Sequence, residues 1–434
     1  MDDALALMIR HSPAQRTSAR LALLALGGFL LMLFSGCKLA DVFSLSGPQS
    51  TMLTGGPVAK SQWDLFMVTV YVTTFIFIIV GTVLAYAQIK FRAKSEAEEH
   101  VEPPAEAGHG NPLVEIGLIA GSVALLVIIA IPTLKGIWYT HDVPEAEKAD
   151  ALDVTATGYQ WWFKFEYNTE KIQTMMGEQN LATGNELIVP AGRPVRVQVR
   201  TVDVIHSFWL PKLAGKVDMI PNRPNFLWFK ADHPGYYYGQ CAEYCGDSHA
   251  IMRFRVIALE KDDYDRWLAN QKQPARAVTT ADASRQHVEF ASLSSASVPP
   301  TGPGSTLTGS PTSAFQEWQA KQLPSANEDP ALIAKGRKLF SEKTCISCHT
   351  VRGHEGIGIT GPELTHVGAR STIAAGVLEN SPERMHQWIN NPNYFKPGNK
   401  MFNGGYTDTD TGQRKFTLND EEIDAIVAYL QSLK

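Results

Sequence analysis

Cysteine is scarce in this chain: only five occur among 434 residues. Neither sign of charge is in excess, since 39 basic and 44 acidic residues leave a formal net charge of −5. Neither residues 141–272 nor residues 315–434 have the basic bias of a nucleic-acid-binding domain, so we predict no nucleic-acid partner. With so few cysteines, each one can be interpreted from its own neighbourhood.

The densest group of metal-binding side chains lies in the segment 241–252, which contains Cys241, Cys245, His249 and Met252. Thiolates, imidazoles and thioethers suit copper rather than magnesium or calcium. Two thiolates this close can bridge two metal ions and let them share one electron. Two alternatives stay open. A zinc site would need a second histidine and would give Met252 no role, and an exported chain could instead pair the cysteines as a disulfide.

Cys345-Ile-Ser-Cys348-His349 is the C-x-x-C-H signature for covalent attachment of a c-type haem. The two thiols would form thioethers to the haem, and His349 would take one axial position on the iron. A thioredoxin-like redox pair is the alternative, and the histidine directly after the second cysteine argues against it. Haem c is attached outside the cytoplasm, so this end of the chain must be exported.

The N-terminus also indicates export. Arg10, Arg16 and Arg20 precede the apolar run 21–34, which is too short for a comfortable transmembrane helix and typical of a signal peptide. We assign the signal peptide to residues 1–36. Cys37 then follows a sequence that resembles a lipoprotein cleavage box, although phenylalanine rather than leucine stands three positions before it. Lipidation of Cys37, an ordinary signal peptide and a retained anchor all remain open.

A transmembrane hairpin is predicted at 63–140, with helices at about 65–89 and 113–134, after an exported segment at 37–62. Lys90, Arg92 and Lys94 begin the loop between the helices. The positive-inside rule places that loop in the cytoplasm, so both ends of the hairpin lie outside.

Residues 141–272 are predicted to form an all-β domain. Val195, Val197 and Val199 alternate with polar residues, and Gly, Pro and Asn clusters separate the short strands. Many short strands of this kind are typical of a sandwich or barrel. His206 directly follows the clearest strand and supplies a second imidazole for the copper-type cluster. A short helix at 262–272 closes the domain.

Residues 273–314 are rich in Ala, Ser, Thr and Pro, and we interpret them as a linker. As a flexible coil of about 40 residues it would have a root-mean-square span of roughly 35 Å. Residues 315–434 follow as a mostly helical domain, with one helix at 330–340 and a C-terminal helix opened by a capping box at Thr417.

The order of hairpin, copper-type cluster and haem signature resembles subunit II of haem–copper cytochrome c oxidase, of the caa3 type with a fused cytochrome c domain. The resemblance covers essentially everything after residue 60. It implies a multidomain membrane protein with a two-helix hairpin, a cupredoxin-like sandwich and an all-α class I cytochrome c domain. It also implies a dinuclear copper centre, CuA, whose ligands would be His206, Cys241, the backbone carbonyl of Glu243, Cys245, His249 and Met252.

Further site residues rest on the same resemblance. The side chain of Glu243 would help to bind magnesium, and Trp161 would relay the electron, unless it is simply core. Glu115 would open a proton pathway, or else only stabilise a helix N-terminus. The Pro397-Gly398-x-x-Met401 pattern makes Met401 the second axial ligand of haem c. The rivals to Met401 are Met385, His354, His366 and His386.

The resemblance implies the electron-input subunit of a respiratory oxidase, which passes electrons from cytochrome c through haem c and CuA to haem a in subunit I. Oxygen reduction and proton pumping would belong to that partner. We expect the bacterial inner membrane, with both redox domains on the periplasmic face, and expect the other oxidase subunits, lipid and a c-type or quinol-linked donor as partners. The alternatives are a subunit of a nitric-oxide or nitrous-oxide reductase and a copper-delivery protein.

Overall fold

The computed structural model describes residues 47–93, 95, 111–278, 311–354, 356–401, 405–407 and 414–434. Residues 48–434 belong to one compact unit. The predicted signal peptide and Cys37 lie outside the described residues, as does most of the predicted linker.

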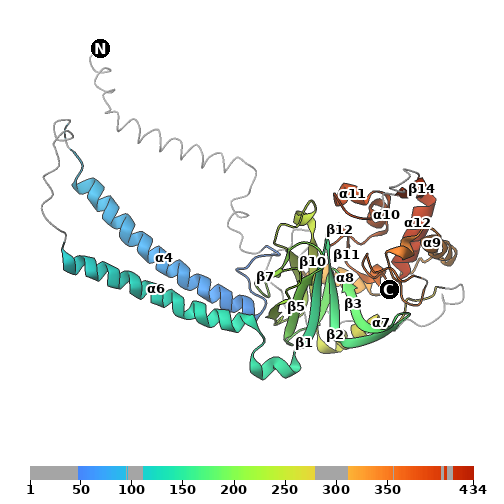
Figure 1. The fold of residues 1–434 in the computed structure, drawn as a ribbon, viewed down its shortest axis with the longest axis horizontal. Coiled ribbons are helices and arrows are strands. Elements are labelled where there is room, and N and C mark those ends of the chain that lie inside the picture. Colours follow the sequence, from blue (N-terminus) through green and yellow to red (C-terminus); the bar gives the residue numbers. More distant parts are fainter. Residues whose placement is uncertain are drawn as a thin grey trace, which may run out of the picture. The chain divides into compact units, whose positions relative to one another are not determined.

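Two long helices form the predicted hairpin: α4 (Pro57–Lys90) and α6 (Pro112–His141) run side by side (Figure 1). Both begin at a proline, which suits the first turn of a helix. Both are long and apolar enough to cross a membrane, by length and composition alone. They extend beyond the predicted spans, because hydropathy detects only the apolar part of a helix. The end of α6, beyond the predicted span, contacts the β domain. There the backbone carbonyl of Tyr139 accepts a hydrogen bond from Trp228 (2.8 Å).

The β domain has two five-stranded sheets. The first has the order β3–β2–β1–β5–β8, from β1 (Leu152–Tyr159), β2 (Trp162–Thr174), β3 (Gly177–Gly184), β5 (Val195–Thr201) and β8 (Asn225–Phe229). The second has the order β4–β10–β9–β6–β7, from β4 (Glu186–Pro190), β6 (His206–Trp209), β7 (Lys216–Met219), β9 (Gly235–Cys241) and β10 (Arg253–Leu259). β1 pairs with β5 in parallel, and β4 with β10, while the other pairs are antiparallel.

The core of this domain lies between the sheets. Phe163 from the first sheet packs its ring 4.9 Å from that of Phe254, which stacks on Phe208 at 4.4 Å within the second sheet. The predicted alternation in β5 is confirmed: its valines are fully buried and the residues between them are partly or fully exposed. The strand pattern indicated a sandwich or a barrel, and the structure is a sandwich of two sheets, as the family resemblance implied.

The C-terminal domain is mostly helical. Its helices are α9 (Pro330–Glu342), α10 (Pro382–Asn390), α11 (Pro392–Phe395) and α12 (Asp420–Ser432). The other elements of the described chain are η1 (Glu145–Asp150), η2 (His249–Ile251), α7 (Lys261–Lys272), α8 (Pro311–Lys321), η4 (Cys345–Ser347), η5 (Val367–Ala369), β11 (Thr372–Ile373), β12 (Leu378–Glu379), β13 (Gly405–Thr407) and β14 (Arg414–Thr417). The capping box of α12 lies at Asn419 and Glu422, not at Thr417 as predicted. Asn419 has the extended backbone that a cap requires, and its side chain accepts from the Glu422 amide.

The sequence predicts that residues 315–434, and with them most of helix α8, belong to the haem domain. The structure places α8 differently. Phe315 and Trp318 are buried in the core of the β domain, together with Trp267 of α7. The end of the same helix contacts the C-terminal domain, because Gln322 donates to the backbone carbonyl of Ala369 (2.8 Å). Helix α8 therefore joins the two domains instead of belonging to one of them.

Candidate metal centre

Strand ends and one loop bring the predicted metal ligands together. His206 begins β6 and Cys241 ends β9, and these two strands pair in antiparallel fashion. The chain then turns through Cys245 and η2 before Met252, directly ahead of β10. Because β9 and β10 are paired and antiparallel, the loop between them stays at the end of the sheet where β9 ends and β10 begins.

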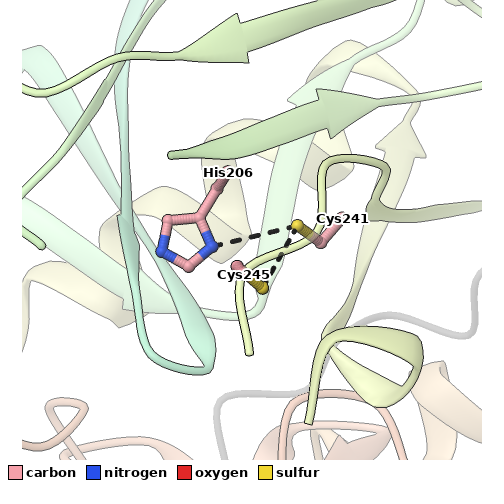
Figure 2. Close-up of side chains that lie close together, drawn as sticks. All are labelled: His206, Cys241 and Cys245. Atoms are coloured by element: carbon pink, nitrogen blue, oxygen red, sulfur yellow. Dashed lines mark hydrogen bonds between the residues drawn. The ribbon is translucent and has the colours of Figure 1, made fainter. Parts of the chain in front are cut away.

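The side-chain donors lie within one small cluster. The sulfur of Cys241 lies 3.8 Å from Nδ1 of His206 and 3.7 Å from the sulfur of Cys245 (Figure 2). Nδ1 of His249 lies 3.6 Å from the Cys245 sulfur, and the Met252 sulfur lies 3.9 Å from it. The backbone oxygen of Glu243 lies 3.3 Å from the Cys241 sulfur. Each of the other predicted donor atoms therefore lies within 3.9 Å of one of the two cysteine sulfurs.

This donor set fits a pair of copper ions. A disulfide is excluded in this structure, because its sulfurs would be about 2.05 Å apart and both cysteines are free. Two thiolates, two imidazoles and a thioether are the soft and borderline ligands that copper prefers, whereas a tetrahedral zinc site would leave Met252 without a role.

The pKa values of the two thiols move in opposite directions. A hydrogen bond from Cys245 lowers the pKa of Cys241, and His206 and the backbone around Glu243 act in the same direction, against the effect of burial. The same pairing with Cys241 raises the pKa of Cys245. Of the two thiols, Cys241 therefore loses its proton more readily.

Asp203 is a functional residue that the sequence reasoning missed. Its carboxylate lies 2.9 Å from Nε2 of His206 and accepts from the Gln160 amide at 2.8 Å. Burial raises the pKa of Asp203, but the bonds from His206 and Gln160 outweigh it, so the net pKa is lowered. The carboxylate thus fixes the His206 ring with Nδ1 toward the sulfurs. Its only sequence signal is its place three residues before His206.

Trp161 lies between the metal ligands and the C-terminal domain. Its Nε1 donates to the backbone carbonyl of Cys245 at 3.0 Å, and the side chain is 7% exposed. The other edge of the ring faces Gly398, where an added Cβ would lie 2.9 Å from Trp161 Cη2. Trp161 is also part of the buried core of the β domain, so its packing suits both of the predicted roles.

The C-x-x-C-H segment has features that a c-type haem requires. Cys345 and Cys348 are free thiols. His349 is held through Nδ1, which lies 2.8 Å from the carbonyl oxygen of Pro362, and this assigns Nε2 as the ligand atom. Burial lowers the pKa of His349, which keeps the ring neutral and able to ligate. The residues present therefore fit the group.

The rivals to Met401 are engaged elsewhere in the domain. Met385 is buried and its sulfur accepts from Gln431, while His366 bonds the backbone carbonyl oxygens of Gln273 and Lys434. His354 bonds the Tyr429 hydroxyl, and His386 faces Asp420 and Asp424. Met401 is partly buried against the same core as Cys345, which leaves it the favoured second ligand.

Two further predicted residues lie outside these clusters. Glu115 occupies the exposed first turn of α6, where the Asn111 side chain caps the helix. The Glu243 side chain is partly exposed beside the metal ligands.

The fold and site together define a class: a copper-binding cupredoxin-like domain joined to a c-type cytochrome domain and a helical hairpin. The family "Cytochrome C oxidase subunit II, periplasmic domain" matches residues 152–259, and "Cytochrome c" matches residues 333–434. Cytochrome c oxidase subunit 2 of Alkalihalophilus pseudofirmus is 31% identical over 408 residues, which cover 94% of this chain and 95% of that protein. The chain therefore belongs to the cytochrome c oxidase subunit II family and is part of a haem–copper oxidase, an oxidoreductase complex.

Two further similar proteins are also described as subunit II of a cytochrome oxidase. Cytochrome c oxidase subunit 2 of Bacillus sp. (strain PS3) is 28% identical over 425 residues, covering 95% of this chain and 97% of that protein. A crystal structure of the periplasmic domain of cytochrome oxidase subunit II from Bradyrhizobium japonicum is 35% identical. It covers 28% of this chain and 93% of its own, with a TM-score of 0.24.

Proposed function

We propose that this chain is the electron-input subunit of its oxidase. It receives electrons from a c-type donor on its haem domain and passes them through a dinuclear copper centre to haem a in the catalytic partner. The observation that carries the proposal is the convergence of six donor atoms, five of them soft or borderline, in a chain that also has a complete haem c attachment motif.

Each ligand has a distinct part. Cys241 and Cys245 would bridge the two copper ions, and His206 and His249 would each bind one of them. The Met252 sulfur and the Glu243 carbonyl would complete the set. When bound, the centre supplies one-electron redox chemistry with the charge shared by two metals. The chain's own contribution is a rigid, buried ligand cage that rearranges little when the charge changes.

Trp161 is the proposed relay between the two sites. Its indole bonds the backbone of the ligand Cys245 on one side and contacts the Met401-bearing segment at Gly398 on the other. A large aromatic ring that contacts the Cys245 backbone and the segment before Met401 offers a continuous path of packed atoms between them. This supports the relay over a purely structural tryptophan.

The proposed orientation has both redox domains on the periplasmic face of the bacterial inner membrane. Lys90 ends α4 and Arg92 comes two residues later, and both favour a cytoplasmic loop. Glu115 then lies at the cytoplasmic end of α6, where it would take up protons for the partner subunit. Magnesium at the Glu243 side chain and lipid at Cys37 stay predictions of the family resemblance.

The test is purification of the native complex, followed by metal analysis, absorption spectra and low-temperature EPR. We expect haem a and copper alongside haem c, and a mixed-valence dinuclear copper signal. Cys245→Ser should abolish that signal and leave the haem c spectrum intact, because the bridge needs both thiolates. The reciprocal variant Met401→His should shift the haem spectrum and leave the copper signal unchanged.

Two outcomes would contradict the proposal. A wild-type complex without haem a would favour one of the nitrogen-oxide reductases. A mononuclear copper signal would remove the bridged centre, and copper that exchanges freely with a chelator would favour the copper-delivery alternative.

A further inference from the structure

The segment between α11 and Met401 lies directly against the copper-ligand loop. Lys396 Nζ donates to the backbone carbonyl of Trp161 at 2.7 Å. One residue further on, the carbonyl of Pro397 accepts from the hydroxyl of Ser248, the neighbour of His249, at 2.8 Å. Two hydrogen bonds therefore connect segment 396–401, which we call the haem-ligand segment, to the residues around the metal cluster.

Lys396 is unusual because it is buried at this contact. Its exposure is 3%, although lysine is almost never fully buried without a partner. Its Nζ bonds across to the β domain, to the very residue that contacts the metal-ligand loop. A lysine that stabilised only the haem domain would not need a hydrogen bond from its Nζ to Trp161 of the other domain.

Gly398 explains why the segment can come so close. Its φ of +76° lies in the left-handed region that favours glycine. A side chain there would also collide with the Trp161 ring and with the Asp247 carboxylate, since a Cβ would lie 2.9 Å from each. The backbone of the haem-ligand segment thus rests on the ring itself, and Lys396 holds it there.

We propose that Lys396 is a positioning residue for electron transfer from haem c to the copper centre. It anchors the Met401 segment on Trp161, so that the ring bridges this segment and the Cys245 backbone. The transfer moves one electron from the reduced haem iron to the oxidised copper pair, and no bond in the chain forms or breaks. The inference rests on the proposed function, and it adds the contact between Lys396 and Trp161 that holds the two sites together.

The experiment uses the full chain in its complex and compares wild type with Lys396→Met, which keeps most of the length of the side chain and removes its amino group. Loss of this buried hydrogen bond should lower hydrogen-exchange protection of segments 160–163 and 396–401 about tenfold. The first-order rate of haem-to-copper transfer, followed after rapid photoreduction of haem c, should also fall about tenfold or more. The haem and copper spectra should not change.

Three further variants separate positioning from folding. Lys400→Met removes an exposed lysine from the same segment and should change neither the protection nor the rate. Lys396→Arg keeps a cationic donor and should restore most of the rate. Ser248→Ala removes the second bond from the opposite side, and so repeats the test if Lys396→Met does not fold.

The outcomes distinguish this inference from the proposed function. A wild-type chain without copper or haem c signals would refute the function before any kinetics are measured. Normal signals with an unchanged transfer rate in both Lys396→Met and Ser248→Ala would overturn the positioning role alone.

Discussion

Asp203 shows how a proposed ligand can depend on a residue outside the donor cluster. The carboxylate bonds one ring nitrogen of His206 and leaves the other facing the Cys241 sulfur. It also accepts from the backbone amide of Gln160, next to Trp161, so one side chain orients both the ligand and the proposed relay.

Asp203→Asn should weaken copper binding about 10- to 100-fold, because outer residues of this kind tune metal affinity by that amount. The measurement is copper retention against a graded chelator, with the haem c spectrum as an internal reference. Asp262→Asn, at an exposed position on α7, is the matched control and should retain copper like wild type. Equal retention in both variants would contradict the role of Asp203.

The ligands themselves could be predicted from the sequence, whereas their supports could not. Cys241, Cys245, His249 and Met252 stand close together in the chain, so spacing alone indicates a site. Lys396 is separated from Trp161 by 235 positions. No local pattern distinguishes it from any other lysine, because only the packing of two domains buries it.

At the scale of elements, the haem domain depends on the close packing of α9 on α12. Gly336 is the point of nearest approach, where an added Cβ would lie 1.8 Å from the backbone oxygen of Ala425. Glycine is otherwise unfavourable inside a helix, so its use here indicates that the close packing of the helices outweighs the cost.

Gly336→Ala should destabilise the haem domain by about 1–3 kcal/mol, because the helices must separate to admit the methyl group. The measurement is thermal or denaturant unfolding of the full chain, followed through the haem absorption. Lys335→Ala, on the exposed side of the same helix, should change stability little. A stabilised Gly336→Ala would show instead that helix propensity outweighs the clash.

Periodicity predicted the helices and strands that bury one face, such as β5 and α12. It did not predict which domain α8 packs against. Its pair Phe315 and Trp318 resembles Tyr264 and Trp267 of α7, and all four are buried in the β-domain core. The pattern indicates an amphipathic helix, but it does not identify which of two cores buries the apolar side.

At the scale of the molecule, the described start of the predicted linker makes defined contacts with the haem domain. Arg352 donates to the carbonyl of Lys272 at 3.1 Å, and the Ala275 amide donates to the carbonyl of Arg352 at 2.7 Å. The start of the predicted linker is therefore bound to the haem domain. Composition indicates that such a segment can be flexible, but it carries no signal for partners far away in the sequence.

Glu186 makes a buried polar contact between the two domains. It lies on β4 with 2% exposure. Its carboxylate accepts from the amide and the hydroxyl of Ser371, at 2.8 and 2.5 Å, and from the amide of Thr372 at 3.2 Å. These three bonds hold the haem domain on strand β4, in addition to the bonds that Lys396 and Ser248 make.

Glu186→Ala should weaken domain docking by about 2–3 kcal/mol, because buried donors on Ser371 and Thr372 lose their acceptor. Glu186→Gln should have a much smaller effect, since the amide oxygen can still accept these bonds. Hydrogen exchange at the two amides reports the docking directly. Glu178→Ala, an exposed glutamate of the same domain, is the control. If Glu186→Ala and Glu186→Gln lost equal protection, the negative charge near Arg370, rather than the hydrogen bonds, would be what holds the domains together.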